Sequence, residues 1–265
     1  MSDTNQSQLV QHSRDAQGVH QICLNQPDAY NVLSSDAMRA LQHILDAIAQ
    51  DTQARVAVIS AKGRAFCAGH DLREMRATPS LDYYQTLFHQ CSQMMMSVQR
   101  LPVPVIAVVD GIATAAGCQL VAMCDLAVAS QASKFAVSGV NLGLFCSTPS
   151  VALSRNLQRK AAFEMLVTGD FITADQALAK GLVNAVVPAD QLGAEADRYV
   201  RSILAKPRTA VAIGKQLFYE QLEQPLEAAY VMAENAMACN MMDATALEGV
   251  QAFIDKRQPA WKPSN

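Results

Sequence analysis

The chain has 265 residues and a net charge of −3, with 51% hydrophobic and 17% charged residues. This composition is typical of a globular protein with a large buried core. The low net charge excludes a broadly basic face for nucleic acid or for an anionic membrane. The longest apolar run, residues 103–109, is too short to span a bilayer. We therefore expect no nucleic-acid partner and no membrane partner.

The cysteines and the start of the chain predict the cellular compartment. The seven cysteines are odd in number and scattered, which predicts reduced, buried thiols and no disulfide framework. No CxxC or HExxH motif occurs, so no metal site is expected. Residues 1–13 are polar and lack the basic and apolar segments of a signal peptide. Together these features predict a cytoplasmic protein.

Predicted strands and helices alternate through the first part of the chain. In chain order they are a strand at 19–25, a helix ending at 50, a strand at 55–60, a helix at 83–100, a strand at 105–109, a helix at 116–124, and strands at 125–129 and 134–137. The runs at 55–60 and 105–109 are almost entirely apolar, which is typical of strands that are covered on both faces. This order predicts an α/β fold.

The last part of the chain has no strand pattern. Four helices are predicted, at residues 192–205, 207–222, 225–241 and 244–256. We therefore divide the chain into an α/β core, residues 1–200, and a C-terminal helical region, residues 201–265. The methionines of the helical region fit either a buried core or an adaptable subunit interface, and composition leaves both interpretations open.

Two loops bring small residues to the start of a predicted helix. In the first, Ala68 and Gly69 precede Asp71, which has the spacing of a helix capping box with Glu74. In the second, residues 113–117 are all small and follow a buried strand. A capped helix start explains the first loop, and close packing explains the second. Together, however, they offer two backbone N–H groups at helix starts, and two such donors on one oxygen form an oxyanion hole.

Several segments, in the same order, resemble the enoyl-CoA hydratase/isomerase, or crotonase, superfamily. They are residues 24–27 (LNQP), 66–72 (FCAGHDL), 104–111 (PVIAVVDG), 117–120 (GCQL), 123–126 (MCDL), 168–170 (TGD) and 248–257 (EGVQAFIDKR). The resemblance covers residues 19–261, nearly the whole chain. It implies a spiral of ββα turns and a C-terminal helical trimerisation region, which gives a homotrimer or a hexamer (a dimer of trimers). It also implies an acyl-CoA ligand, with coenzyme A as part of the substrate and no separate cofactor, and a lyase or isomerase activity in fatty acid metabolism.

The same resemblance implies which residues form the site. The backbone N–H groups of Ala68 and Ala116 are expected to form the oxyanion hole. The position beside them is Gln119, where hydratases carry a catalytic glutamate. Coenzyme A is expected to contact Asp28, Ala29, Tyr30, Ala68, Gly69 and His70, with Lys256 near its phosphates.

This chain departs from the hydratases at both catalytic glutamates, because the matching positions hold Gln119 and Gly139. Glutamine can orient a water molecule but cannot transfer a proton, and glycine has no side chain. Each positioned acid or base typically contributes about 10²–10⁴ in rate, so ordinary hydration is not expected. Related dehalogenases carry an aspartate at a third position, which is Phe145 here.

His70 leaves other activities open. The Ala-Gly-His-Asp segment around His70 resembles that of methylmalonyl-CoA decarboxylase, and residues 146–148 follow in a loop that we expect to contact the acyl group. One hypothesis is an acyl-CoA enzyme without a glutamate pair, namely a decarboxylase, isomerase or thioesterase that uses His70. The second is an ordinary enoyl-CoA hydratase or isomerase, and the third is a non-catalytic acyl-CoA-binding protein. In the plainest interpretation, His70 only hydrogen-bonds to the backbone.

Overall fold

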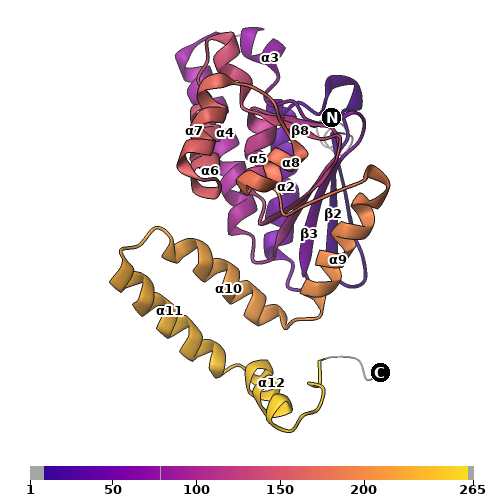
Figure 1. The fold of residues 1–265 in the computed structure, drawn as a ribbon, viewed down its shortest axis with the longest axis vertical. Helices are drawn as coiled ribbons and strands as arrows, with labels where there is room; N and C mark the ends of the chain where they lie inside the picture. Colours follow the sequence, from indigo (N-terminus) through magenta and orange to yellow (C-terminus); the bar gives the residue numbers. More distant parts are fainter. Residues whose placement is uncertain (1–8, 78, 262–265) are drawn as a thin grey trace.

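The computed structural model describes residues 9–77 and 79–261, and it builds the α/β body on two sheets (Figure 1). Most of the polar start, residues 1–8, lies outside the described residues. In spatial order, the large sheet contains β1 (Val10–Arg14), β2 (Val19–Leu24), β3 (Val56–Ala61), β5 (Val105–Val109), β7 (Leu126–Ser130) and β10 (Ala185–Val187). The small sheet contains β4 (Ala65–Cys67), β6 (Ile112–Thr114), β8 (Lys134–Ala136) and β9 (Ile172–Thr173).

The chain forms a spiral in which each turn contributes one strand to each sheet. β3 leads to β4, β5 leads to β6, and β7 leads to β8. Successive turns pair in parallel in both sheets, so that Ile59 lies opposite Ala107 in the large sheet and Cys67 opposite Ala113 in the small one. The predicted spiral of ββα turns is therefore confirmed. Because β4 and β6 are parallel neighbours, the loops that follow them lie side by side.

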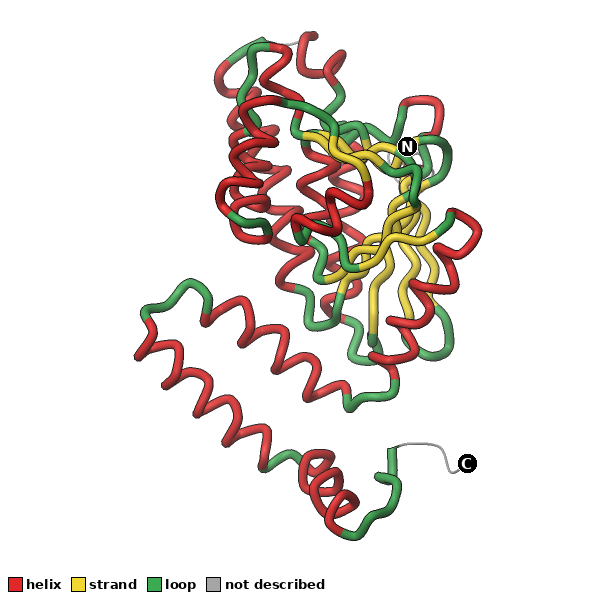
Figure 2. Tube along the Cα trace, in the orientation of Figure 1, coloured by secondary structure: helices red, strands yellow, loops and turns green. Residues whose placement is uncertain are grey.

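The central strands are apolar on both faces because helices cover both faces of the large sheet (Figure 2). Side chains of a strand alternate between its two faces. Ala57 and Ile59 belong to the main core with α2 (Ser35–Gln50) and α4 (Leu81–Arg100). Val56 and Val58 pack on the other face against Val200 of α9 (Leu192–Leu204). This two-sided burial explains why β3 has no polar–apolar alternation.

The other helices of the body surround the small sheet and the loops that follow it. They are α3 (Leu72–Ala77), α5 (Ala116–Met123), α6 (Ser147–Asn156), α7 (Arg159–Thr168) and α8 (Ala174–Lys180). The helices α6, α7 and α8 and the short strands β4 and β6 were not predicted from the sequence. Three-residue strands such as β4 and β6 are too short to show a period, so only their tertiary pairing defines them.

The C-terminal helices α10 (Arg208–Gln221), α11 (Leu226–Met241) and α12 (Ala244–Ile254) project away from the body (Figure 1). The predicted boundary at residue 200 falls inside α9, which packs on the large sheet. Met237 is 72% exposed and Met242 is 78% exposed, so these methionines do not form a core within one chain. No helix among the described residues is long and apolar enough to cross a membrane.

Candidate active site

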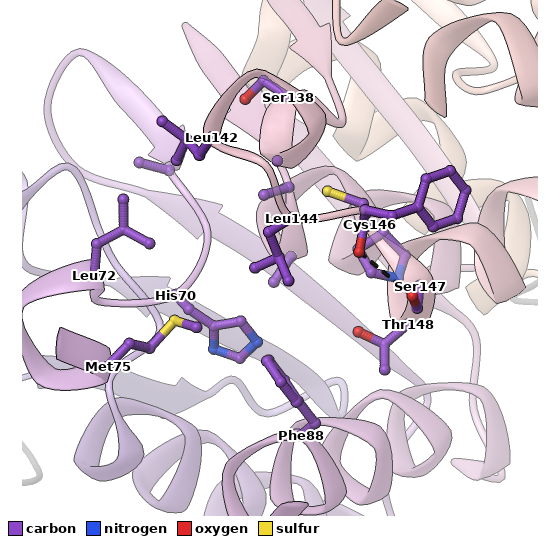
Figure 3. A pocket seen from close by; sticks show the side chains of 16 residues that line it. His70, Leu72, Met75, Phe88, Ser138, Leu142, Leu144, Cys146, Ser147 and Thr148 are labelled. Atoms are coloured by element: carbon purple, nitrogen blue, oxygen red, sulfur yellow. Dashed lines mark hydrogen bonds between the residues drawn. The ribbon is translucent and has the colours of Figure 1, made fainter. Parts of the chain in front are cut away.

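A cavity of about 280 Å³ lies where the loops after β4 and β6 meet η2 (Ser138–Leu142) and the start of α6 (Figure 3). This volume is at the lower end of the range for ligand pockets. Most of its wall is apolar, and its polar side chains are those of His70, Ser138, Ser147 and Thr148. Among the described residues that line it, none is Lys, Arg, Asp or Glu. The cavity therefore suits an uncharged, largely apolar group.

The first backbone donor at this cavity is the N–H of Ala116, the first residue of α5. Ala115 has φ 51°, a value that few non-glycine residues adopt, and its own N–H donates to the carbonyl oxygen of Ala136 at 3.0 Å. The carbonyl oxygen of Ala115 accepts a hydrogen bond from Gln119 N at 3.0 Å, so this carbonyl points into the helix. In a trans peptide, the N–H points opposite to the carbonyl, so the Ala116 N–H points out of the helix start. Ala116 lines the cavity.

The second donor is not the one that the sequence predicted. The Ala68 N–H donates to the carbonyl oxygen of Tyr30 at 3.0 Å, so it is not available to a ligand and this prediction was wrong. One residue later, the carbonyl oxygen of Gly69 accepts from Leu33 N at 2.7 Å. The trans Gly69–His70 peptide therefore directs the His70 N–H away from Leu33.

Gly69 brings the two donors close together. It has φ +91°, and a Cβ added to it would lie 3.3 Å from Ala116 N and 2.9 Å from the Ala115 Cβ. The loop that carries the His70 N–H is thus in contact with the helix start that carries the Ala116 N–H. Only glycine fits this conformation and this spacing. The arrangement places two outward-facing amides beside the same cavity.

The imidazole ring of His70 projects into the cavity between Met75 and Phe88 (Figure 3). Its Nδ1 lies 3.3 Å from the carbonyl oxygen of Leu33, which can only accept, so Nδ1 carries the hydrogen. Burial lowers the pKa of His70 below its ordinary value of 6.5, and the contact with Leu33 and the charge of Glu74 oppose this shift. The ring is therefore neutral at pH 7. Its Nε2 is a buried lone pair that has no hydrogen-bond partner among the described residues.

The two positions expected to match the hydratase glutamates, 119 and 139, place no carboxylate in the cavity. Gln119 is only 4% exposed, does not line the cavity, and has no partner for Oε1 among the described residues. A Cβ at Gly139 would lie 2.5 Å from the carbonyl oxygen of Leu144 and 2.8 Å from Cys146 Sγ. The loop 143–146 thus fills the space that a side chain at position 139 would need. The structure does not bring Gln119 into the cavity.

The first turn of α6 forms the wall opposite His70. Cys146, Ser147 and Thr148 all line the cavity (Figure 3), and their contact with an acyl group stays a prediction. Burial raises the pKa of the Cys146 thiol, which is therefore protonated at pH 7. Among the described lining residues, His70 is then the group able to accept a proton near neutral pH.

Apart from Ala68, Gly69 and His70, the residues predicted to contact coenzyme A lie in two places. Asp28, Ala29 and Tyr30 form an exposed turn that is joined to the site through the Ala68–Tyr30 hydrogen bond. Lys256 follows α12, at the far end of the C-terminal helices, and does not approach the cavity within one chain (Figure 1).

Several residues of this region were not predicted. Phe88 and Leu144 line the cavity without belonging to any motif, and Phe88 has only the helical spacing of a core residue. Arg64 lies over the Tyr30 ring, 4.5 Å from its centroid, and donates a hydrogen bond to the Tyr30 hydroxyl. No signal in the sequence connects Arg64 to Tyr30, because the loop before β4 that carries Arg64 meets the turn that carries Tyr30 only in the fold.

Comparisons with known proteins agree with this geometry. Residues 14–264 match the family model of enoyl-CoA hydratase/isomerase. A crystal structure of an enoyl-CoA hydratase from Mycobacterium smegmatis is 58% identical, has a TM-score of 0.94, and covers 96% of this chain and 98% of its own. The structure of human enoyl-CoA hydratase domain-containing protein 3 is 45% identical, with a TM-score of 0.91 and coverage of 96% and 100%. The rat protein named enoyl-CoA hydratase domain-containing protein 3, mitochondrial, is 47% identical over 94% of this chain and 83% of its own length.

These relatives overturn the prediction of a cytoplasmic location, because the rat, mouse, frog and human proteins are all named as mitochondrial. Unpaired thiols argue against an oxidising compartment, but they do not distinguish one reducing compartment from another. The match of one family model to residues 14–264, together with the ββα spiral, identifies the fold family. The chain belongs to the enoyl-CoA hydratase/isomerase family.

Proposed function

We propose that the chain is an acyl-CoA enzyme that stabilises a thioester enolate between the N–H groups of His70 and Ala116. The observation that carries this proposal is the contact of Gly69 with Ala115 and Ala116, which sets two outward-facing amides beside one cavity. Negative charge builds up on a thioester oxygen when the neighbouring carbon loses a proton, and paired amides stabilise such an oxygen. The bound ligand supplies coenzyme A, so no separate cofactor enters the proposal.

We infer that the reaction is the shift of a double bond from C3–C4 to C2–C3 of an enoyl-CoA. His70 Nε2 takes a proton from C2, the electron pair moves through the thioester onto its oxygen, and the proton returns to C4. One base is sufficient for this reaction, whereas hydration needs groups to activate water and to supply a proton. His70 lines the cavity and its Nε2 is neutral and unpartnered, which supports it as that base; because Nε2 is buried, the ring has to turn toward C2 of the substrate to reach it.

Two alternatives have less support. Ordinary hydration lacks both carboxylates, and the space at Gly139 is filled by Leu144 and Cys146. Decarboxylation of a malonyl-type thioester needs a polar clamp for a carboxylate. A neutral Nε2 offers a lone pair and not a proton, and none of the described lining residues is a cation. An uncharged enoyl group therefore fits this cavity better than an acid.

Purified protein is expected to convert 3-hexenoyl-CoA to 2-hexenoyl-CoA, measured by the absorbance of the conjugated thioester, and to leave crotonyl-CoA almost unhydrated. His70→Ala retains the backbone N–H but removes Nε2, so it should lower kcat by about 10²–10⁴ while hexanoyl-CoA still binds. Rapid hydration of crotonyl-CoA would contradict the proposal. Binding of hexanoyl-CoA without any turnover would still support the acyl-CoA site but would reject His70 as a base.

The pH dependence of isomerisation follows from the lowered pKa of His70. The base must be unprotonated, and its pKa in the folded protein lies below 6.5. We therefore expect the midpoint of the acid-side decline in kcat/KM to lie below pH 6.5. A midpoint above pH 6.5 would mean that another group transfers the proton.

We also propose that the C-terminal helices build a trimer, which can pair into a hexamer. Large apolar side chains on these helices are exposed in the single chain, among them Leu226 at 74% and Phe253 at 86%. An exposed apolar surface of this kind is typical of a subunit interface. In a trimer, α12 of one subunit would approach the site of another, where Lys256 could reach the phosphates of coenzyme A.

A further inference from the structure

A second cavity adjoins the first, and Phe145 lines both. The second cavity is a groove of about 630 Å³ between α6 and α7, which lie side by side in Figure 1. Among the described residues, Phe145 alone belongs to the linings of both cavities. Its side chain is 43% exposed, so it is not fixed in a packed core. Phe145 is therefore the residue at which the cavity of His70 and the groove meet.

The groove is apolar where it is deepest. Ala162 and Leu166 are buried along it, and Phe163 lines it although 60% of its surface is exposed. Its charged residues lie on α7, and one of them, Glu164, is paired with Lys180 at 2.7 Å. A groove with an apolar floor suits a hydrocarbon chain better than a polar head group.

We propose that the acyl chain of a long-chain acyl-CoA passes Phe145 and lies in the groove between α6 and α7. The substrate class is then long-chain acyl-CoA, and Phe145 is a specificity-determining residue. This inference rests on the proposed function, because the two amides place the thioester in the first cavity. A short chain is contained in that cavity of about 280 Å³, and the groove at Phe145 is an adjoining apolar space that could take a longer one.

The test compares the affinities of butyryl-CoA and palmitoyl-CoA by titration calorimetry, with palmitoyl-CoA kept below its micelle concentration. Each fully buried methylene raises affinity roughly fourfold, so even partial burial of the tail should make palmitoyl-CoA bind more than about tenfold tighter. Phe163→Glu puts a charge in the groove and should remove most of this difference. Val167→Glu is the matched control, because Val167 is on the same helix, is 45% exposed and lines neither cavity.

Three results would overturn the inference. Equal affinities for the two thioesters in the wild-type protein would mean that the chain ends in the first cavity. Equal losses in the Phe163→Glu and Val167→Glu proteins would mean non-specific attraction to α7. A changed oligomeric state in Phe163→Glu, with unchanged affinity for palmitoyl-CoA, would show that a second copy of the chain covers the groove. Failure to bind either thioester would reject the acyl-CoA site itself. This result differs from equal binding of both thioesters, which would reject only the groove.

Discussion

Replacing Gly69 by alanine is expected to lower kcat/KM for isomerisation of 3-hexenoyl-CoA by about 10²–10³, the usual effect of losing one donor of an oxyanion hole. Gly69 has φ +91°, and a Cβ there would lie 2.9 Å from the Ala115 Cβ and 3.3 Å from Ala116 N. The loop that carries the His70 N–H must then move away from Ala116. Steady-state kinetics with the wild-type and variant proteins would measure the loss.

Gly181→Ala is the matched control for the Gly69 substitution. Gly181 also has a positive φ, +83°, but it ends α8, and the nearest atom to an added Cβ is the Asn156 carbonyl oxygen at 3.7 Å. Both variants carry the penalty of alanine in a left-handed conformation, so both should lose stability. Only Gly69→Ala should lose rate. Equal rates for the two variants would show that the contact between Gly69 and Ala116 does not position a donor.

Replacing Asp125 by alanine is expected to lower the free energy of unfolding by about 3–5 kcal/mol, because it leaves a buried charge without its partner. Asp125 Oδ2 accepts from Lys215 Nζ at 2.7 Å and from Val105 N at 2.6 Å, and its Oδ1 accepts from the Tyr219 hydroxyl at 2.8 Å. Lys215 is 9% exposed, and burial lowers its pKa while Asp125 opposes the shift. Urea unfolding at one fixed protomer concentration would measure the change.

An exposed ion pair provides the comparison for Asp125. Arg155 and Glu223 also connect the body to the segment that follows α10, with Nε and Oε1 3.1 Å apart, but their side chains are 53% and 61% exposed. Such pairs are typically worth about 0–1 kcal/mol, so Glu223→Ala should change the unfolding free energy little. If Asp125→Ala lowered the free energy of unfolding as little as Glu223→Ala, water would have to reach Lys215. The Asp125–Lys215 pair would then not attach α10 to the body.

The long elements of the fold could be predicted from sequence because each has a hydrophobic pattern that can be recognised without knowing its neighbours in the fold. The all-apolar run of β3 indicates a strand with two covered faces, and the structure buries Val56 and Ile59 on opposite sides of it. The short strands β4 and β6 have no such pattern. They exist because the spiral sets Cys67 opposite Ala113, a pairing between residues far apart in the chain.

The sequence predicts the two loops that line the candidate site, but it does not show which backbone amide of the first loop is available to a ligand. The small residues around Gly69 predict a close backbone approach, and the structure has one there. Which amide of that loop is free depends on Tyr30 and Leu33, whose carbonyl and N–H groups hydrogen-bond to Ala68 and Gly69. These partners come from another turn of the chain, so no local pattern in residues 65–71 reveals them.

The expected glutamate position at residue 139 shows the same limit of prediction from sequence. The sequence gives Gly139 as a position without a side chain, which is a statement about one residue. The structure adds that Leu144 and Cys146 have closed over it, so a glutamate placed there would have no room. At position 139 the cavity therefore lacks both a carboxylate and the space for one.

The most direct test of the central claim is the infrared carbonyl stretch of hexanoyl-CoA labelled with carbon-13 at its thioester carbonyl. Two amide donors on that oxygen weaken the C=O bond, so binding to the wild-type protein should shift the band to lower wavenumber. The shift should persist in His70→Ala, which retains its backbone N–H, and should be clearly smaller in Gly69→Ala, which loses one of the two donors. A bound thioester whose carbonyl band stays at its solution position in the wild-type protein would contradict the account.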